Sequence, residues 1–241
     1  SEEVDIVIGT HALIQDSVDI PNLAVGIVDE QHRFGVMQRA ALTEGGLRPH
    51  LLAMSATPIP RSLSLTVFGD LDVSVLDEMP SGRKPIKTRW VAKEQRDSAY
   101  EFVRSEMEAG RQAFIVFPLV EGSESVQARA ATEEHERLSR DVFTKHRLGL
   151  LHGRMKTGEK EDVMQRFSSG ELDALVSTSV IEVGIDVPNA TVMMIDGADR
   201  FGLAQLHQFR GRVGRGEHKS YCMLLSDTAS ENAKERLSAL A

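Results

Sequence analysis

Two adjacent carboxylates follow a short apolar run near the start of the chain. The run Leu23–Val28 leads directly into Asp29 and Glu30. Open α/β sheets bind ligands at the carboxyl ends of their strands. Hydrolysis of a nucleoside triphosphate needs one carboxylate near Mg²⁺ and a second group that positions the attacking water. Asp29 and Glu30 suit these two roles, although an isolated Asp-Glu pair is more often a solvated turn after a buried strand.

An arginine- and glycine-rich segment lies near the other end of the chain. On a helix, Gln208, Arg212 and Arg215 would share a face, because they are spaced i, i+4 and i+7. Two guanidiniums on one face suit the charge that develops on a transferring γ-phosphate. Gly211 and Gly214 would each cost such a helix about 1 kcal/mol relative to alanine. We therefore expect something to approach the backbone closely there; the alternative is a basic, solvated helix end.

Loops with hydroxyl groups or glycines follow four other apolar runs. Their candidate residues are Thr10, Ser55, Thr57, Gly153, Thr178, Gly184 and Asp186. Such loops can offer backbone N–H groups and hydroxyls to phosphates, and Asp186 can accept a hydrogen bond from a ribose or an arginine. Ordinary capping of strands and helices is the competing interpretation. The sequence has no Cys/His cluster typical of zinc sites and no Gly-x-Ser-x-Gly elbow.

The elements that must position these residues alternate between short apolar runs and helix-period segments, which is typical of a mostly parallel α/β sheet. Strands are predicted over Asp5–Ile8, Val25–Val28, His50–Met54, Arg89–Val91, Ala113–Phe117, Leu148–Leu151, Ala174–Ser177, Thr191–Ile195 and Tyr221–Leu225. Helices are predicted over Glu94–Ala109, Gly158–Ser168 and Ala229–Leu240. Residues 121–127 are polar and lack periodicity, which predicts a loop.

Prolines and glycines interrupt the pattern once, and this break divides the chain. We predict that residues 1–80 form part of one sheet domain, residues 81–87 a linker, and residues 88–241 a second, nearly complete sheet domain. The first part has about three strands, fewer than the usual five or six. We therefore expect the first domain to be truncated, with the rest of it upstream.

Composition limits the classes of protein. The chain has 241 residues, 41% of them hydrophobic and 27% charged, which is ordinary for a globular protein. No apolar run approaches the roughly 20 residues of a membrane span, and no secretory signal opens the chain. The single cysteine, Cys222, fits a reducing compartment and the core of a strand, so we expect the cytoplasm.

Net charge does not decide the partner. It is −8, which alone argues weakly against nucleic acid. Residues 1–80 carry 4 Lys/Arg and 12 Asp/Glu, however, whereas the remaining residues carry 24 of each. The deficit is confined to the first third, and backbone N–H groups also bind phosphates.

In order and spacing, these segments resemble the motifs of the superfamily-2 DExH helicase core, which consists of two RecA-like parallel-sheet domains. The matching segments are Gly9–His11 (motif Ib), Asp29–His32 (II), Ser55–Thr57 (III), Ser177–Pro188 (V) and Gln208–Arg215 (VI). Residue by residue, stretches such as Asp29–Val36 and Phe201–Gln208 are similar to the sequences of the RecG family of bacterial branched-DNA translocases. The transcription-repair coupling factor family is the alternative; its motif II typically reads Asp-Glu-Glu-Gln, whereas this chain has Gln31 and His32.

The resemblance implies a role for each matched residue. Asp29 would hold Mg²⁺ and Glu30 would activate the hydrolytic water. The implied catalytic residues are Asp29, Glu30, Gln208, Arg212 and Arg215. Those that would link the nucleotide cleft to domain movement are Gln31, His32, Ser55 and Thr57. The implied nucleotide contacts are Gly184 and Asp186, and the implied DNA-backbone contacts are Thr10, Gly153 and Thr178.

The resemblance also implies an activity. It is that of an ATP- and Mg²⁺-dependent DNA helicase or translocase that remodels stalled forks and junctions in repair and recombination. Its partner would be branched or double-stranded DNA, and it would be a monomer at the bacterial nucleoid. The phosphate-loop pattern Gly-x-x-x-x-Gly-Lys-[Ser/Thr] occurs nowhere in the sequence, so we expect it upstream and expect the isolated chain to be inactive. A non-catalytic DNA- or protein-binding module is the second hypothesis.

Overall fold

The chain forms two compact units, Ser1–Ser74 and Val75–Ala241. The computed structural model describes residues 4–14, 18, 20, 22–29, 49–54, 72–78, 83–118, 124–178, 186–227 and 230–240. No helix among these residues has both the length and the apolar character needed to cross a membrane.

The first unit contains a two-stranded parallel sheet. Strand β1 (Val25–Val28) pairs with β2 (His50–Ala53), and a short 3-10 helix, η1 (His11–Ile14), precedes them. Both strands were predicted. The predicted strand Asp5–Ile8 is wrong, because these residues form no strand and the side chain of Ile8 is exposed. An apolar run becomes a strand only where a neighbour shares its hydrogen-bond ladder, and no described segment pairs with this one.

The second unit is built on six parallel strands in the order β3-β8-β7-β4-β6-β5. The strands are β3 (Lys87–Val91), β4 (Gln112–Val116), β5 (Leu148–Leu151), β6 (Ala174–Ser177), β7 (Ala190–Ile195) and β8 (Tyr221–Leu225). All were predicted. The central strands β4, β6 and β7 are buried along their whole length, which explains why they are continuous apolar runs in the sequence.

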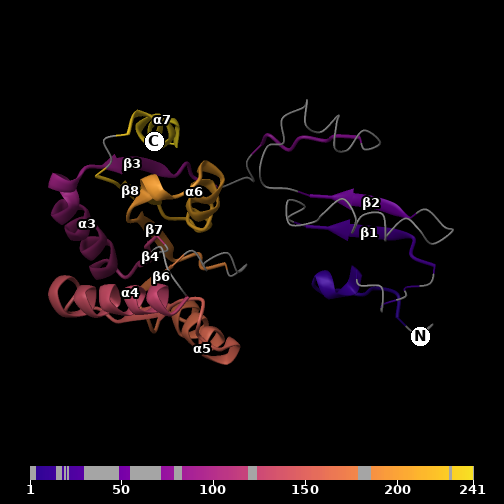
Figure 1. Ribbon diagram of the computed structural model, residues 1–241, viewed down its shortest axis with the longest axis horizontal. Helices are drawn as coiled ribbons and strands as arrows, with labels where there is room; N and C mark the ends of the chain where they lie inside the picture. The colour runs from indigo at the N-terminus through magenta and orange to yellow at the C-terminus, as the bar shows by residue number, and fades with distance from the viewer. Residues whose placement is uncertain are drawn as a thin grey trace. The chain divides into compact units, whose positions relative to one another are not determined.

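Helices cover both faces of this sheet (Figure 1). They are α3 (Arg96–Glu108), α4 (Glu124–Arg137), α5 (Thr157–Ser168), α6 (Leu203–Arg210) and α7 (Glu231–Leu240). One core cluster joins Ile115 of β4 to α3 and to the π-helical turn Leu138–Val142 that follows α4; the other joins Phe114 of β4 to α5, α6 and α7. Alternate residues of one strand thus enter opposite cores, and the unit is a doubly wound α/β sheet.

Three of these helices agree with the predicted ones, and α4 corrects a prediction. Helix α3 buries Tyr100, Val103 and Met107 and ends before Gly110, whose φ is +80°. The predicted loop at 121–127 is wrong from Glu124 onward, where α4 begins. This helix is polar over most of its length and rests on the sheet through small contacts such as Ala131. It therefore lacks the apolar period on which the prediction depended.

Candidate functional site

Six of the candidate residues lie outside the described part of the chain: Glu30, Gln31, His32, Ser55, Thr57 and Gly184. In the first unit, Asp29 directly follows β1 and is exposed, at the carboxyl end of a parallel strand. Thr10 lies just before η1, and its carbonyl oxygen accepts a hydrogen bond from the Leu13 amide at 3.0 Å.

Asp29 fits Mg²⁺ as this ion binds in triphosphate sites. Mg²⁺ there uses one or two carboxylates together with waters and substrate phosphates, so that it needs no complete protein cage. Among the described residues, no group of three or more His, Cys, Asp or Glu side chains could hold a metal ion. A single exposed carboxylate at a strand end is consistent with a metal that arrives with its nucleotide.

In the second unit, the segment Gly211–Gly216 forms a turn that we call the arginine loop. Helix α6 ends at Arg210, and Gly214 has a φ of +78°, in the left-handed region. The predicted helical face is therefore wrong, because Gln208 lies on α6 whereas Arg212 and Arg215 lie beyond its end. The i, i+4, i+7 spacing would place the three side chains on one face only if the helix continued, but it ends at Arg210 and the chain turns at Gly214.

The expected close approach to the backbone is present at one of the two glycines. A Cβ atom at Gly214 would lie 2.8 Å from Cγ1 of Ile86, whereas one at Gly211 would meet only carbonyl oxygens of the preceding turn at 3.4 Å. The approaching chain is the entering segment, Arg83–Lys87, which leads into β3. Its Arg83 Nε atom donates to the carbonyl oxygen of Gly214 at 3.3 Å, and Lys87 N donates to that of Ser220 at 2.9 Å.

On its other side, the arginine loop contacts residues 186–188. The Nη1 atom of Arg215 lies 3.6 Å from Oδ1 of Asp186. A Cβ atom at Gly216 would clash with the carbonyl oxygen of Pro188. Between these contacts, Val213 is fully buried in the core. The loop is thus fixed by its own buried side chain and by neighbours on both sides, and Asp186 accepts from an arginine, one of the two partners expected for it.

Gly153 and Thr178 lie at the same edge of the sheet. They follow the neighbouring strands β5 and β6, in which Leu151 pairs with Ser177, and the Thr178 amide donates to the Leu151 carbonyl oxygen at 3.3 Å. Gly153 is exposed. Thr178 is only 3% exposed, and its hydroxyl has no hydrogen-bond partner among the described residues. A buried hydroxyl without a partner is unusual and calls for an explanation.

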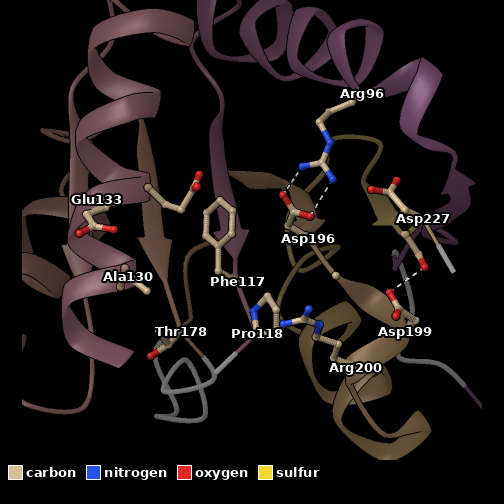
Figure 2. Close-up of a pocket in the computed structure, with 14 residues that line it drawn as sticks. Arg96, Phe117, Pro118, Ala130, Glu133, Thr178, Asp196, Asp199, Arg200 and Asp227 are labelled. Atoms are coloured by element: carbon tan, nitrogen blue, oxygen red, sulfur yellow. Dashed lines mark hydrogen bonds and ion pairs between the residues drawn. The ribbon is translucent and has the colours of Figure 1, made fainter. Parts of the chain in front are cut away.

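A cavity of about 490 Å³ opens at this edge, and Thr178, Phe117, Arg200 and Asp227 are among the residues that line it (Figure 2). Two of the charged side chains that line the cavity, Arg96 and Asp196, form an ion pair with each other. The guanidinium of Arg96 binds both carboxylate oxygens of Asp196, one of them at 3.0 Å. Burial alone would lower the pKa of Arg96, but hydrogen bonds to Asp196 and Tyr100 raise it. The ion pair therefore fixes the end of β7 to the start of α3.

Cations surround the end of β5. Burial lowers the pKa of His152, and the nearby charges of Lys160 and Arg154 lower it further. Lys160 also donates to the Gly153 carbonyl oxygen at 2.9 Å. The two cations beside His152 favour phosphate binding at this strand end, although Glu159 lies near them too.

Sequence reasoning missed Arg83, Arg96 and Arg200. Arg83 was assigned to a linker because of its Pro- and Gly-rich surroundings. The only signal for it was indirect: two costly glycines indicated that something approaches the backbone closely there, without saying what. Arg96 and Arg200 carry no motif, and their places became apparent only when α3 and the end of β7 were brought together.

Known proteins share this sequence and fold. Proteins named ATP-dependent DNA helicase RecG from Synechocystis sp. and Thermotoga maritima are 52% and 55% identical to 98% of the chain. The chain covers 28% and 30% of them, so that it spans about a third of the length of the curated relatives it matches. A solved structure of RecG bound to a three-way DNA junction matches 98% of the chain with a TM-score of 0.76 and 52% identity, over 30% of that protein.

A more distant structure shows the fold alone. Yeast Dbp5 bound to RNA and ADP BeF3 is 17% identical and matches with a TM-score of 0.66, over 95% of this chain and 60% of that protein. Residues 94–217 match the family model of the helicase conserved C-terminal domain. This match covers more than half of the chain and includes β4, β6, β7 and the arginine loop. The chain therefore belongs to the helicase conserved C-terminal domain family.

Proposed function

We propose that this chain is part of the motor of an ATP-dependent DNA helicase or translocase of the RecG kind, which remodels forks and junctions. The observation that carries the proposal is the identity of 52–55% to RecG helicases over 98% of the chain. The parallel sheets support it, because they place Asp29, Gly153 and Thr178 after the carboxyl ends of strands, where open α/β sheets bind ligands. The protein would act as a monomer on branched or double-stranded DNA, at the nucleoid in the bacterial cytoplasm.

The residues implied on the nucleotide side come from both units. Asp29 would hold Mg²⁺, which neutralises charge on the triphosphate, and Glu30 would orient the attacking water. Arg212 and Arg215 would bind the phosphates, with Gln208 beside them and Asp186 and Gly184 at the nucleotide. The separation of 3.6 Å between Arg215 and Asp186, in partly exposed side chains, is typical of pairs worth about 0–1 kcal/mol. Such a pair readily gives up its arginine to a phosphate.

The DNA side would lie at the end of β5 and β6. A phosphate oxygen would accept a hydrogen bond from the Thr178 hydroxyl and relieve the cost of leaving it unpaired, about 1–3 kcal/mol. Gly153, exposed beside it, presents backbone among cations, and Thr10 would make a similar contact from the first unit. Gln31, His32, Ser55 and Thr57 would couple nucleotide binding to movement.

The test is ATP hydrolysis by the full-length protein that contains this chain. We expect forked DNA to stimulate hydrolysis strongly, and we expect Glu30→Gln and Arg215→Ala each to lower the stimulated rate by about 100-fold or more. Arg140→Ala is the matched control, because Arg140 is exposed and pairs with its neighbour Asp141.

The outcomes separate the alternatives. Equal stimulation by linear duplex and by forks would favour a general double-strand translocase of the coupling-factor kind. Absence of hydrolysis with every DNA would contradict the motor and leave a DNA- or protein-binding module. An unchanged rate in Glu30→Gln would contradict the assignment of the catalytic residues.

A further inference from the structure

The entering segment contacts the arginine loop and the residues that follow it. Arg83 donates to Gly214, Lys84 Nζ donates to the Glu217 carbonyl oxygen at 2.6 Å, and Ile86 lies against Gly214. Further along both segments, Lys87 N donates to the Ser220 carbonyl oxygen, and β3 then pairs with β8 from Lys87 and Tyr221 onward. These residues were expected to form a linker, yet they belong to the packed structure of the second unit.

Arg83 makes the contact that matters most for the two loop arginines. Its Nη2 atom lies 3.5 Å from the Gly211 carbonyl oxygen, and its Nε atom lies 3.3 Å from that of Gly214. The two carbonyl groups bracket Arg212 and Val213 in the sequence. A planar guanidinium that donates in two directions fixes the distance between its acceptors better than a single donor does.

The same carbonyl group also orients the second arginine. The Gly211 carbonyl oxygen accepts from Arg215 Nε at 3.1 Å, so that Arg83 and Arg215 share one acceptor. A carbonyl oxygen has two lone pairs and can accept both bonds. Ile86 removes the remaining freedom, since it leaves no space beside Gly214. The orientation of Arg215 therefore depends on a residue that precedes it by most of the length of the second unit.

We propose that Arg83 is a positioning residue for phosphate-directed Arg212 and Arg215. The inference rests on the proposed function, in which these two arginines bind phosphate. Arg83 touches no nucleotide in this scheme and acts through the carbonyl groups of Gly211 and Gly214. A small misplacement of catalytic groups suffices for a large loss of rate, so loss of Arg83 should slow turnover more than it weakens binding.

The first experiment measures DNA-stimulated ATP hydrolysis by the full-length protein. Arg83→Ala should lower kcat about tenfold and change the KM for ATP about twofold or less, because nucleotide affinity comes mainly from other contacts. Arg83→Lys, which keeps the charge and one donor, should recover part of the rate. Arg140→Ala, an equal loss of charge at an exposed site, should behave like the wild type.

A double-mutant cycle tests the route of the effect. If Arg83 acts through the arginine loop, adding Arg83→Ala to a protein that already carries Arg215→Ala should lower kcat little further. Independent, multiplicative losses would show that Arg83 acts elsewhere and would overturn the proposal. An unchanged kcat in Arg83→Ala would overturn it as well.

Hydrogen exchange provides a readout that needs no activity. In Arg83→Ala, amides of residues 211–216 should exchange about tenfold faster, while those of β4 and β7 should be unchanged. If the wild type hydrolyses no ATP, the proposed function fails, but exchange still decides whether Arg83 orders the loop. Loop exchange that is insensitive to Arg83→Ala overturns the positioning role, whatever the activity.

Discussion

The two units differ most in what covers their strands. Ile115 in β4 of the second unit is 0% exposed, whereas Ile27 in β1 of the first unit is 64% exposed. Both residues lie within parallel strands and have ladder partners. Pairing into a parallel sheet therefore does not by itself bury a side chain. Burial in the second unit comes from the helices on its two faces, and we expect stability to follow that cover.

The largest effect should come from emptying the covered core. Ile115→Ala should lower the free energy of unfolding by about 2–5 kcal/mol, because it leaves a cavity in a packed interior. Its counterpart Ile27→Ala should change it by about 0.5 kcal/mol or less. Urea unfolding followed by the single tryptophan, Trp90, and by circular dichroism measures the two losses.

Labelling of the single cysteine gives an independent check. Burial raises the pKa of Cys222 to about 12, so an alkylating reagent reaches its thiolate only after the second unit opens. Alkylation should accelerate in Ile115→Ala and stay at the wild-type rate in Ile27→Ala. Similar losses in the two variants would contradict the comparison.

The next effect should come from breaking the polar connection between sheet and helix cover. Arg96→Ala leaves Asp196 without its bidentate partner and should cost about 2 kcal/mol, below the range for fully buried pairs because both side chains are partly exposed. Arg129→Ala removes an exposed pair with Glu133 within one helix and should cost about 0.5 kcal/mol or less. Thermal unfolding of the two variants measures the contrast, and equal shifts would show that the Arg96 pair stabilises no more than a surface pair.

A smaller effect should come from adding a methyl group to a glycine in each unit. Gly214→Ala should cost about 1–2 kcal/mol from its left-handed backbone alone, and the contact with Ile86 adds to this. Gly26→Ala in β1 would meet only Leu51, at an ordinary 3.5 Å, and should cost little. The denaturant midpoints of the two variants measure these losses. An unchanged midpoint in Gly214→Ala would mean that Ile86 and the entering segment move aside at little cost.

The smallest effect should be the dependence on pH. Burial is the first cause that lowers the pKa of both His152 and His207, below the 6.5 of a free imidazole. As pH falls through 6.5 toward these lowered values, the unfolded chain binds protons that the folded chain does not. The free energy of unfolding should therefore decrease with acidification and recover above pH 6.5. The test is unfolding at several pH values, in which His152→Gln should flatten the dependence; a steeper dependence in that variant would contradict it.

Much of the second sheet was predictable because of this same burial. Strands β5, β6 and β8 have the predicted bounds, since apolar runs bounded by polar residues identify covered strands. The apolar run Asp5–Ile8 shows the limit, because composition does not reveal whether a neighbour is present. Helix α4 shows the opposite limit, since a polar helix that rests on alanines has no apolar period to detect.

The described part of the site was predictable as strand ends but not as a loop. Asp29, Gly153 and Thr178 follow strands, as the sequence indicated. The turn that carries Arg212 and Arg215 was not predictable, because its shape depends on Ile86 and Arg83, which are remote in sequence. Local spacing describes helices well, but it contains no information on a contact between distant segments.

The pairing of β3 with β8 has a consequence for how the protein is made. On the ribosome β3 emerges first among the strands of the second unit and β8 emerges last, yet β8 is the only described neighbour of β3. The nascent sheet must wait with an open edge until translation has passed the arginine loop. Such closure between remote segments is slow compared with local folding. The two loop arginines and the segment that anchors them thus come together only when synthesis of the unit is nearly complete.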